Sequence, residues 1–69
     1  MNEIELKFNL KYLINKYVAD KSKKNELLDL ISKDLGCVKY VIYSIDQIKT
    51  ERYDEEDRSL IKDIAYYFI

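Results

Sequence analysis

A single glycine, Gly36, divides the apolar pattern of this 69-residue chain, which contains no proline. Apolar residues recur at helical spacing on both sides of it, at Leu27, Leu28, Ile31 and Leu35 before it and at Val38, Ile42, Ile45 and Ile48 after it. Glycine readily adopts the left-handed backbone conformation with which many helices end. The pattern therefore predicts two amphipathic helices joined by a tight turn, with Gly36 in the left-handed conformation.

The length and composition limit the chain to one domain, residues 1–69. A chain of this size buries only about 60% of the surface that its unfolded form exposes, so its core is small. With 48% hydrophobic and 36% charged residues, it has the composition of a folded protein without long linkers. We expect a mainly α fold, a small helix-turn-helix bundle of four to five short helices with a short strand at the N-terminus.

The N-terminal segment changes its pattern at Leu10. Apolar and polar residues alternate up to that point, which is typical of a half-buried strand over residues 4–8. Beyond it the apolar residues follow one face of a helix, and this spacing predicts a first helix over about residues 10–19. Asn9 is of the residue type that accepts hydrogen bonds at a helix N-terminus, so we expect it to be the cap.

Two further helix starts can be expected from capping residues. After a polar connection, Asn25 or Ser22 is suited to cap a second helix over about residues 25–35. Near the C-terminus, Asp54 precedes three acidic residues and an apolar stripe. Because acidic side chains in a first turn suit the positive end of the helix dipole, the sequence predicts a last helix capped by Asp54.

The segment after Gly36 is compatible with two structures. Its apolar residues lie on one face of a helix over residues 38–48, yet many of its residues are β-branched or aromatic, which favours a strand. In the second case the segment pairs with the N-terminal strand, and the fold is α+β with strands near residues 4–8 and 38–44.

The sequence lacks the side chains that most enzymes use for catalysis. The chain has no histidine, one glycine and one cysteine, which leaves no His-based catalysis, no glycine-rich phosphate loop and no zinc site. Cys37 lies in an apolar run, so we expect it to be a small buried hydrophobic residue. The acidic run Asp54–Asp57 is better explained by helix capping than by metal binding, because consecutive helical residues point in different directions. We expect no cofactor and no metal.

The sequence also bears on location. The first residues lack the basic start and apolar run of a signal peptide, and no apolar stretch approaches the roughly 20 residues needed to span a bilayer. A single cysteine fits a reduced compartment. We therefore expect a cytoplasmic protein without membrane contact.

Charge is unevenly distributed along the chain. Residues 1–25 hold six lysines against three acidic residues, whereas residues 51–69 hold six acidic residues against three basic ones, and the net charge is −1. A basic end permits a phosphate-binding face despite the near-neutral total. Lysines of the polar connection are the candidates for phosphate contacts, at Lys21, Lys23 and Lys24.

If residues 38–48 are helical, the polar side chains of this segment share one face. They are Lys39, Tyr40, Tyr43, Ser44 and Gln47. Lysine and glutamine can contact base edges or phosphates, and tyrosine can contact backbone oxygens or thymine methyl groups. On this interpretation Ser32 faces the second helix where the two helices cross most closely, because a small side chain is needed there, and Leu35, Cys37, Ile42 and Ile45 fill the shared core.

The run around Gly36 resembles the helix-turn-helix of Cro/repressor-type (Xre) regulators. In that family an apolar and a small residue precede the glycine, an apolar residue follows it, and two more lie in the recognition helix. The corresponding residues here, which we expect to form the motif core, are Ile31, Ser32, Leu35, Gly36, Cys37, Ile42 and Ile45. The resemblance implies a fold in which the second helix enters the major groove of DNA.

Three functions are therefore compatible with the sequence. The first is a small sequence-specific DNA-binding transcriptional regulator of the kind that phages and plasmids encode, reading double-stranded DNA with residues 38–48 and dimerising through its C-terminal helix. The second is a small protein-binding inhibitor or adaptor, suggested by seven tyrosines and an acidic C-terminal third. The third is an assembly subunit with the α+β fold.

Overall fold

The computed structural model of the chain describes all 69 residues and contains four α-helices and no strand. The helices are α1 (Glu3–Tyr17), α2 (Lys21–Lys33), α3 (Val38–Ile48) and α4 (Glu55–Phe68), and one 3₁₀ turn, η1 (Leu35–Cys37), separates α2 from α3. The prediction of a small, mainly α bundle is confirmed. The α+β alternative, with strands near residues 4–8 and 38–44, is wrong.

Helix α1 includes the whole segment that was expected to be a strand. It begins at Glu3 because the Asn2 side chain accepts a hydrogen bond from the Glu5 backbone N–H at 2.8 Å, so Asn9 lies inside the helix and caps nothing. The alternating pattern misleads because Leu6 faces the core while Ile4 and Phe8, one turn apart, face solvent. A helix that leaves two large apolar side chains exposed satisfies the same pattern.

The starts of α2 and α4 are set by aspartates. Asp20 accepts a hydrogen bond from the Lys23 backbone N–H at 3.1 Å, so α2 begins four residues earlier than predicted, and neither Ser22 nor Asn25 is its cap. Asp54 accepts a hydrogen bond from the Asp57 backbone N–H at 2.8 Å, which confirms the predicted start of α4. Each aspartate satisfies a backbone donor that the helix itself leaves unpaired.

The turn between α2 and α3 differs from the expected one. Gly36 does not have a positive φ, so the prediction of a left-handed glycine is wrong. Asp34 shapes this turn instead, because its side chain accepts a hydrogen bond from the Gly36 backbone N–H at 2.7 Å, and the chain continues through η1 directly into α3. A side-chain cap thus provides the reversal that a left-handed glycine usually provides.

Helix α3 forms despite its β-branched residues. Val38, Val41 and Ile45 lie on one face and are all buried. Burying such a side chain contributes about 1.5–3 kcal/mol, whereas β-branching lowers helix propensity by less than about 0.7 kcal/mol per residue. Packing against the core therefore decides in favour of the helix, as the apolar spacing of residues 38–48 predicted.

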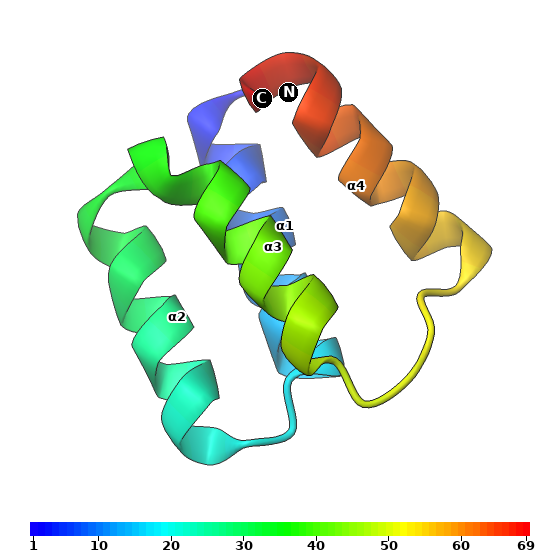
Figure 1. Cartoon of the computed structure of the whole chain (residues 1–69). Coiled ribbons are helices and arrows are strands. Elements are labelled where there is room, and N and C mark those ends of the chain that lie inside the picture. The colour runs from blue at the N-terminus through cyan, green and yellow to red at the C-terminus, as the bar shows by residue number, and fades with distance from the viewer.

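Helix α1 lies at the centre of the bundle. Figure 1 shows α1 behind α3, with α2 and α4 on either side. Twelve buried apolar side chains form the core, and five of them belong to α1: Leu6, Leu10, Leu13, Ile14 and Tyr17. The molecule is flat, with extents of 29 × 28 × 16 Å, so α1 and α3 each keep one face in solvent. Each helix is too short or too polar to cross a lipid bilayer.

Candidate functional site

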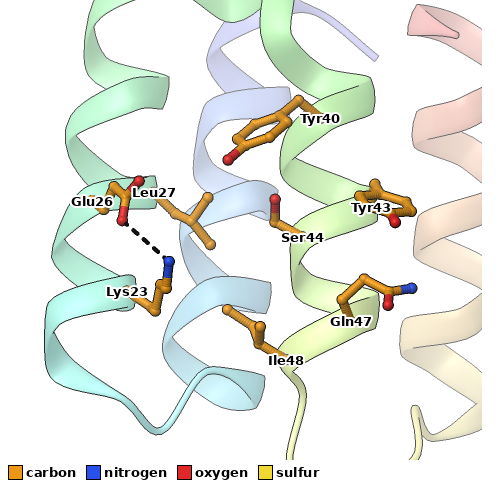
Figure 2. Close-up of a pocket in the computed structure, with 8 residues that line it drawn as sticks. All are labelled: Lys23, Glu26, Leu27, Tyr40, Tyr43, Ser44, Gln47 and Ile48. Carbon is orange, nitrogen blue, oxygen red and sulfur yellow. Dashed lines mark ion pairs between the residues drawn. The ribbon is translucent and has the colours of Figure 1, made fainter.

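A groove runs between α2 and α3 on the outer face of the molecule. Eight residues line it: Lys23, Glu26 and Leu27 of α2, and Tyr40, Tyr43, Ser44, Gln47 and Ile48 of α3 (Figure 2). Lys23 and Ile48 lie far from the η1 turn on their helices, yet they line the same groove. The two helices therefore lie alongside one another and run in opposite directions (Figure 1).

The groove has an apolar floor and polar walls. Leu27 is buried and Ile48 half-buried, whereas Tyr40 and Tyr43 are 54% and 62% exposed. In Figure 2 the Tyr40 ring extends toward α2, while Tyr43 lies on the side of α3 that faces α4. The hollow measures about 170 Å³, slightly more than a cavity that holds benzene, so it can receive one large apolar side chain.

The groove holds little net charge. Its only cation, the Lys23 ammonium, lies 3.8 Å from the Glu26 carboxylate. The next pair of charges along α2, Lys33 and Asp29, is joined at 2.9 Å. Both charged pairs are exposed, so each contributes little to stability, but together they keep the outer face of α2 almost neutral.

The structure brings together part of the predicted DNA-binding set. Four of the five residues predicted on the second helix line the groove, while Lys39 is exposed at the start of α3. The lysines of α2 lie beside the other end of α3: Lys21 is exposed, Lys23 is at the groove and Lys24 is half-buried. Because Lys39 and Ile48 are nine residues apart, about 14 Å separates the two groups of lysines along the helix axis.

The predicted motif core is only partly buried. Ile31 and Ile45 are in the core, Leu35 and Ile42 are half-buried, and Gly36 is exposed. The apolar members occur at helical spacing, but only two of them are buried in the core.

Two members of the motif core have other roles than predicted. Ser32 is exposed and its hydroxyl donates to the Asp29 carbonyl at 2.7 Å, so the prediction that it faces α3 at a close crossing is wrong. Cys37 is half-buried rather than buried, and its thiol donates to the Asp34 carbonyl in the turn, so Val38 takes the core position instead. The change at Cys37 follows from the η1 turn, whereas Ser32 belongs to α2 and lies on the exposed face of that helix.

A second cluster of polar side chains lies where α1 packs against α4. This Asp57 cluster consists of Tyr12, Lys16, Tyr17, Asp54 and Asp57. Both tyrosine hydroxyls donate to the Asp57 carboxylate, which is 3% exposed, and the Tyr12 bond is 2.9 Å long. The Lys16 ammonium lies 2.7 Å from Asp54 and 2.8 Å from Asp57. All the polar atoms of the buried carboxylate are thus engaged within the chain, and the cluster serves the fold.

The cluster shifts the acidity of its members. Burial opposes ionisation of Asp57, but hydrogen bonds from Lys16, Tyr17 and Tyr12 outweigh it and hold the pKa of this carboxyl below its usual value. Hydrogen bonds with Asp54, Asp57 and Tyr12 raise the pKa of Lys16. Burial and the bond to Asp57 raise the pKa of Tyr17. Asp57 is therefore a buried carboxylate that stays charged at neutral pH.

Sequence reasoning missed the cluster because it treated Asp54–Asp57 only as capping residues. A signal was present, since Asp57 precedes Leu60, Ile61 and Ile64 at helical spacing and so belongs to the buried face of α4. No group of three acidic or cysteine side chains converges on a point that could hold a metal ion. Comparisons with protein-family models, curated proteins and solved structures gave no match.

Proposed function

We propose that this protein is a small protein-binding module whose α2–α3 groove receives an apolar side chain from a segment of another protein. The observation that supports this is the pair of exposed tyrosines, Tyr40 and Tyr43, beside an apolar floor formed by Leu27 and Ile48. Tyrosine gives large contact area at low entropic cost and is enriched in protein interfaces. The side chains of the α3 wall form no hydrogen bond within the chain, so each is free to bind a partner.

Charge favours a protein partner over a nucleic acid. Affinity for DNA depends largely on lysine and arginine side chains that are free to neutralise phosphates. In the groove the only cation already faces Glu26, and Asp29 and Asp46 are exposed on the same two helices. An apolar anchor with a few hydrogen bonds needs no such excess of positive charge.

The test is selection of a random peptide library displayed on phage against the immobilised wild-type chain. We expect enrichment of peptides that share an aromatic or large aliphatic residue. Binding of a selected synthetic peptide, measured by fluorescence anisotropy, is expected to weaken at least about tenfold in Tyr40→Ala and in Tyr43→Ala, since each removes a wall of the hollow.

The matched control is Tyr66→Ala, which removes a tyrosine that is 79% exposed on α4, away from the groove. This variant is expected to bind the selected peptide as the wild type does. Equal loss in Tyr66→Ala and Tyr43→Ala would indicate that the peptide adheres to exposed tyrosines in general, and no enrichment at all would contradict the proposal.

A DNA-binding transcriptional regulator is the second candidate, in line with the resemblance to Xre regulators. It is supported by the exposed polar face of α3, where Tyr43, Gln47 and Lys39 lie, and by Lys21, which is exposed at the first residue of α2. Titration of labelled genomic fragments tests it. Binding that falls steeply with salt and is reduced in Lys39→Gln and Lys21→Gln, but is unaffected in Lys62→Gln of α4, would favour DNA over a protein partner.

The cellular setting is part of the proposal. A single half-buried cysteine needs no oxidising compartment, and we propose a cytoplasmic protein. Fractionation of the producing cell, with the chain detected by antibody, tests this location.

A further inference from the structure

The outward face of α1 exposes two large apolar residues, on the opposite side of this helix from the core. Ile4 is 82% and Phe8 74% exposed, and they lie one helical turn apart. Beside them is a hollow of about 320 Å³, lined by Glu3, Ile4, Lys7, Phe8, Lys11 and Leu35. We call this surface the α1 ridge. A projecting aromatic side chain and a hollow that can hold one thus occur on the same surface.

A surface of this kind is complementary to itself. In a two-fold symmetric dimer, the same patch of each copy contacts the other. A side chain that projects from the patch must therefore fit into a hollow on an identical patch. If two α1 helices pair in opposite directions about an axis level with Lys7, each Phe8 comes level with the hollow of the second copy. The half-buried Leu35 then provides an apolar contact at the side of that hollow.

The charges of the ridge specify the same orientation. Glu3 and Lys11 lie at the two ends of the hollow, eight residues or about 12 Å apart along the helix, and neither forms an ion pair within the chain. The antiparallel arrangement places Glu3 of each copy beside Lys11 of the other. A parallel arrangement places like charges together. Lys7 is the exception, because the two Lys7 side chains meet near the axis.

We infer that the α1 ridge binds a second copy of this chain, as an antiparallel, two-fold symmetric pair of α1 helices centred on Phe8. One short helix covers less than the roughly 800 Å² per partner of a standard interface, and the two Lys7 ammonium groups repel each other. The dimer is therefore weak and concentration-dependent. Since the α2–α3 groove lies on the other side of the bundle, the dimer carries two accessible grooves.

Sedimentation equilibrium from about 20 μM to about 1 mM tests the inference, because dissociation constants in this range suit an interface of this size. The wild type is expected to dimerise within this range. Phe8→Ser is expected to raise the dissociation constant at least about tenfold, by removing the projecting aromatic side chain. Lys7→Gln is expected to lower it about threefold, by removing the repulsion at the axis.

Charge reversal tests the antiparallel orientation. Glu3→Lys and Lys11→Glu are each expected to weaken the dimer about threefold to tenfold, and the double variant is expected to recover the wild-type constant. Circular dichroism is used to check that each variant is folded. Glu3 and Lys11 are exposed, so their charge reversals test the dimer even if Phe8→Ser unfolds the chain. Tyr66→Ala is the matched control and is expected to dimerise normally.

Three results would overturn the inference. The first is a wild type that stays monomeric at about 1 mM, the upper end of the range of dissociation constants that suits an interface of this size. The second is a dimer that is lost in Tyr66→Ala but retained in Phe8→Ser, because this would place the contact at the C-terminal end of α4, the dimer surface that the sequence suggested. The third is a monomer that binds vesicles of anionic phospholipid through Phe8, which would make the ridge a lipid contact.

Discussion

Two pairs of tyrosines are used in opposite ways in this molecule. At the contact of α1 with α4, the hydroxyls of Tyr12 and Tyr17 both donate to the buried Asp57 carboxylate. In the α2–α3 groove, Tyr40 and Tyr43 are more than half exposed and their hydroxyls have no partner in the chain. The first pair stabilises the fold, and the second pair is available to bind a partner. Substitutions can therefore separate stability from function.

Among substitutions that remove a polar group, the largest effect is expected at Asp57. Asp57→Ala leaves the hydroxyls of Tyr12 and Tyr17 without their carboxylate acceptor, whereas Lys16 keeps its ion pair with Asp54, and losing these bonds to a buried charged group costs about 3 kcal/mol. For a chain of this size, that corresponds to a fall in Tm of more than about 10 °C, measured by thermal denaturation. Asp63→Ala, an exposed aspartate on the same helix, is the control and is expected to change stability by less than about 0.5 kcal/mol. Equal effects at the two positions would mean that the cluster contributes nothing.

A smaller effect is expected from single hydroxyl groups. The Tyr17 hydroxyl donates to Asp57 and accepts from the Asp54 backbone N–H at 3.2 Å, so Tyr17→Phe is expected to lose about 1.5–3 kcal/mol, the range for bonds to charged groups. The Tyr53 ring packs edge-on against the Tyr17 ring, with centroids 4.9 Å apart, but its buried hydroxyl has no partner.

Tyr53→Phe is therefore the matched control for Tyr17→Phe. Removing this unpaired buried hydroxyl breaks no hydrogen bond and removes the cost of burying a polar group. The stability of Tyr53→Phe is therefore expected to equal or exceed that of the wild type. Urea denaturation of the two variants gives the comparison, and a greater loss in Tyr53→Phe than in Tyr17→Phe would contradict the assignment of the cluster.

Acid is expected to weaken the same contact. The pKa of Asp57 is lower in the folded protein than its ordinary value of 3.8, so the unfolded chain takes up this proton first as the pH falls. The stabilisation is thus present above about pH 4 and is lost as the pH falls through the folded pKa. Urea denaturation of wild type and Asp57→Asn between about pH 6 and about pH 2.5 is expected to show their difference in free energy of unfolding becoming smaller. A constant difference would indicate an unshifted Asp57.

The sequence predicted what depends on local pattern. Helical spacing identified α3 and the core positions Ile31 and Ile45, and the capping preference of aspartate identified the start of α4 at Asp54. These features depend on residues that lie within a few positions of one another in the sequence. The groove was also partly predictable, because the polar side chains of α3 share one face at helical spacing.

What the sequence did not predict depends on contacts between distant residues. Tyr17 and Asp57 are 40 residues apart, and no local signal pairs them. The strand expected at residues 4–8 failed because α1 leaves Ile4 and Phe8 exposed, against the usual preference for burying them. The direction of α3 relative to α2 depends on the Asp34 cap. The sequence did not indicate this cap, because glycine is the residue usually expected at such a turn.

The Gly36 turn offers a further test of how the two sides of the groove are joined. A Cβ atom at this position would lie 2.9 Å from the Asp34 carboxylate oxygen, which would have to move and give up its bond to the backbone N–H. That loss of about 0.5–1 kcal/mol is offset by the lower entropy of an unfolded chain with alanine, so Gly36→Ala is expected to change stability by less than about 1 kcal/mol. Asp34→Ala is expected to lose a similar cap energy. A loss above about 2 kcal/mol in Gly36→Ala alone would indicate a left-handed glycine.

The smallest effect is expected at Tyr43, although its proposed role is the more important one for function. Truncating a surface side chain that makes no internal hydrogen bond typically changes stability by less than about 0.5 kcal/mol, so Tyr43→Ala should unfold in urea as the wild type does. Tyr17→Ala, which removes a fully buried ring, is expected to lose about 3–5 kcal/mol in the same measurement. A loss above about 1.5 kcal/mol in Tyr43→Ala would place this tyrosine with the stabilising pair. If its stability is unchanged while peptide binding is lost, Tyr43 belongs to the binding surface, and the division between the two tyrosine pairs holds.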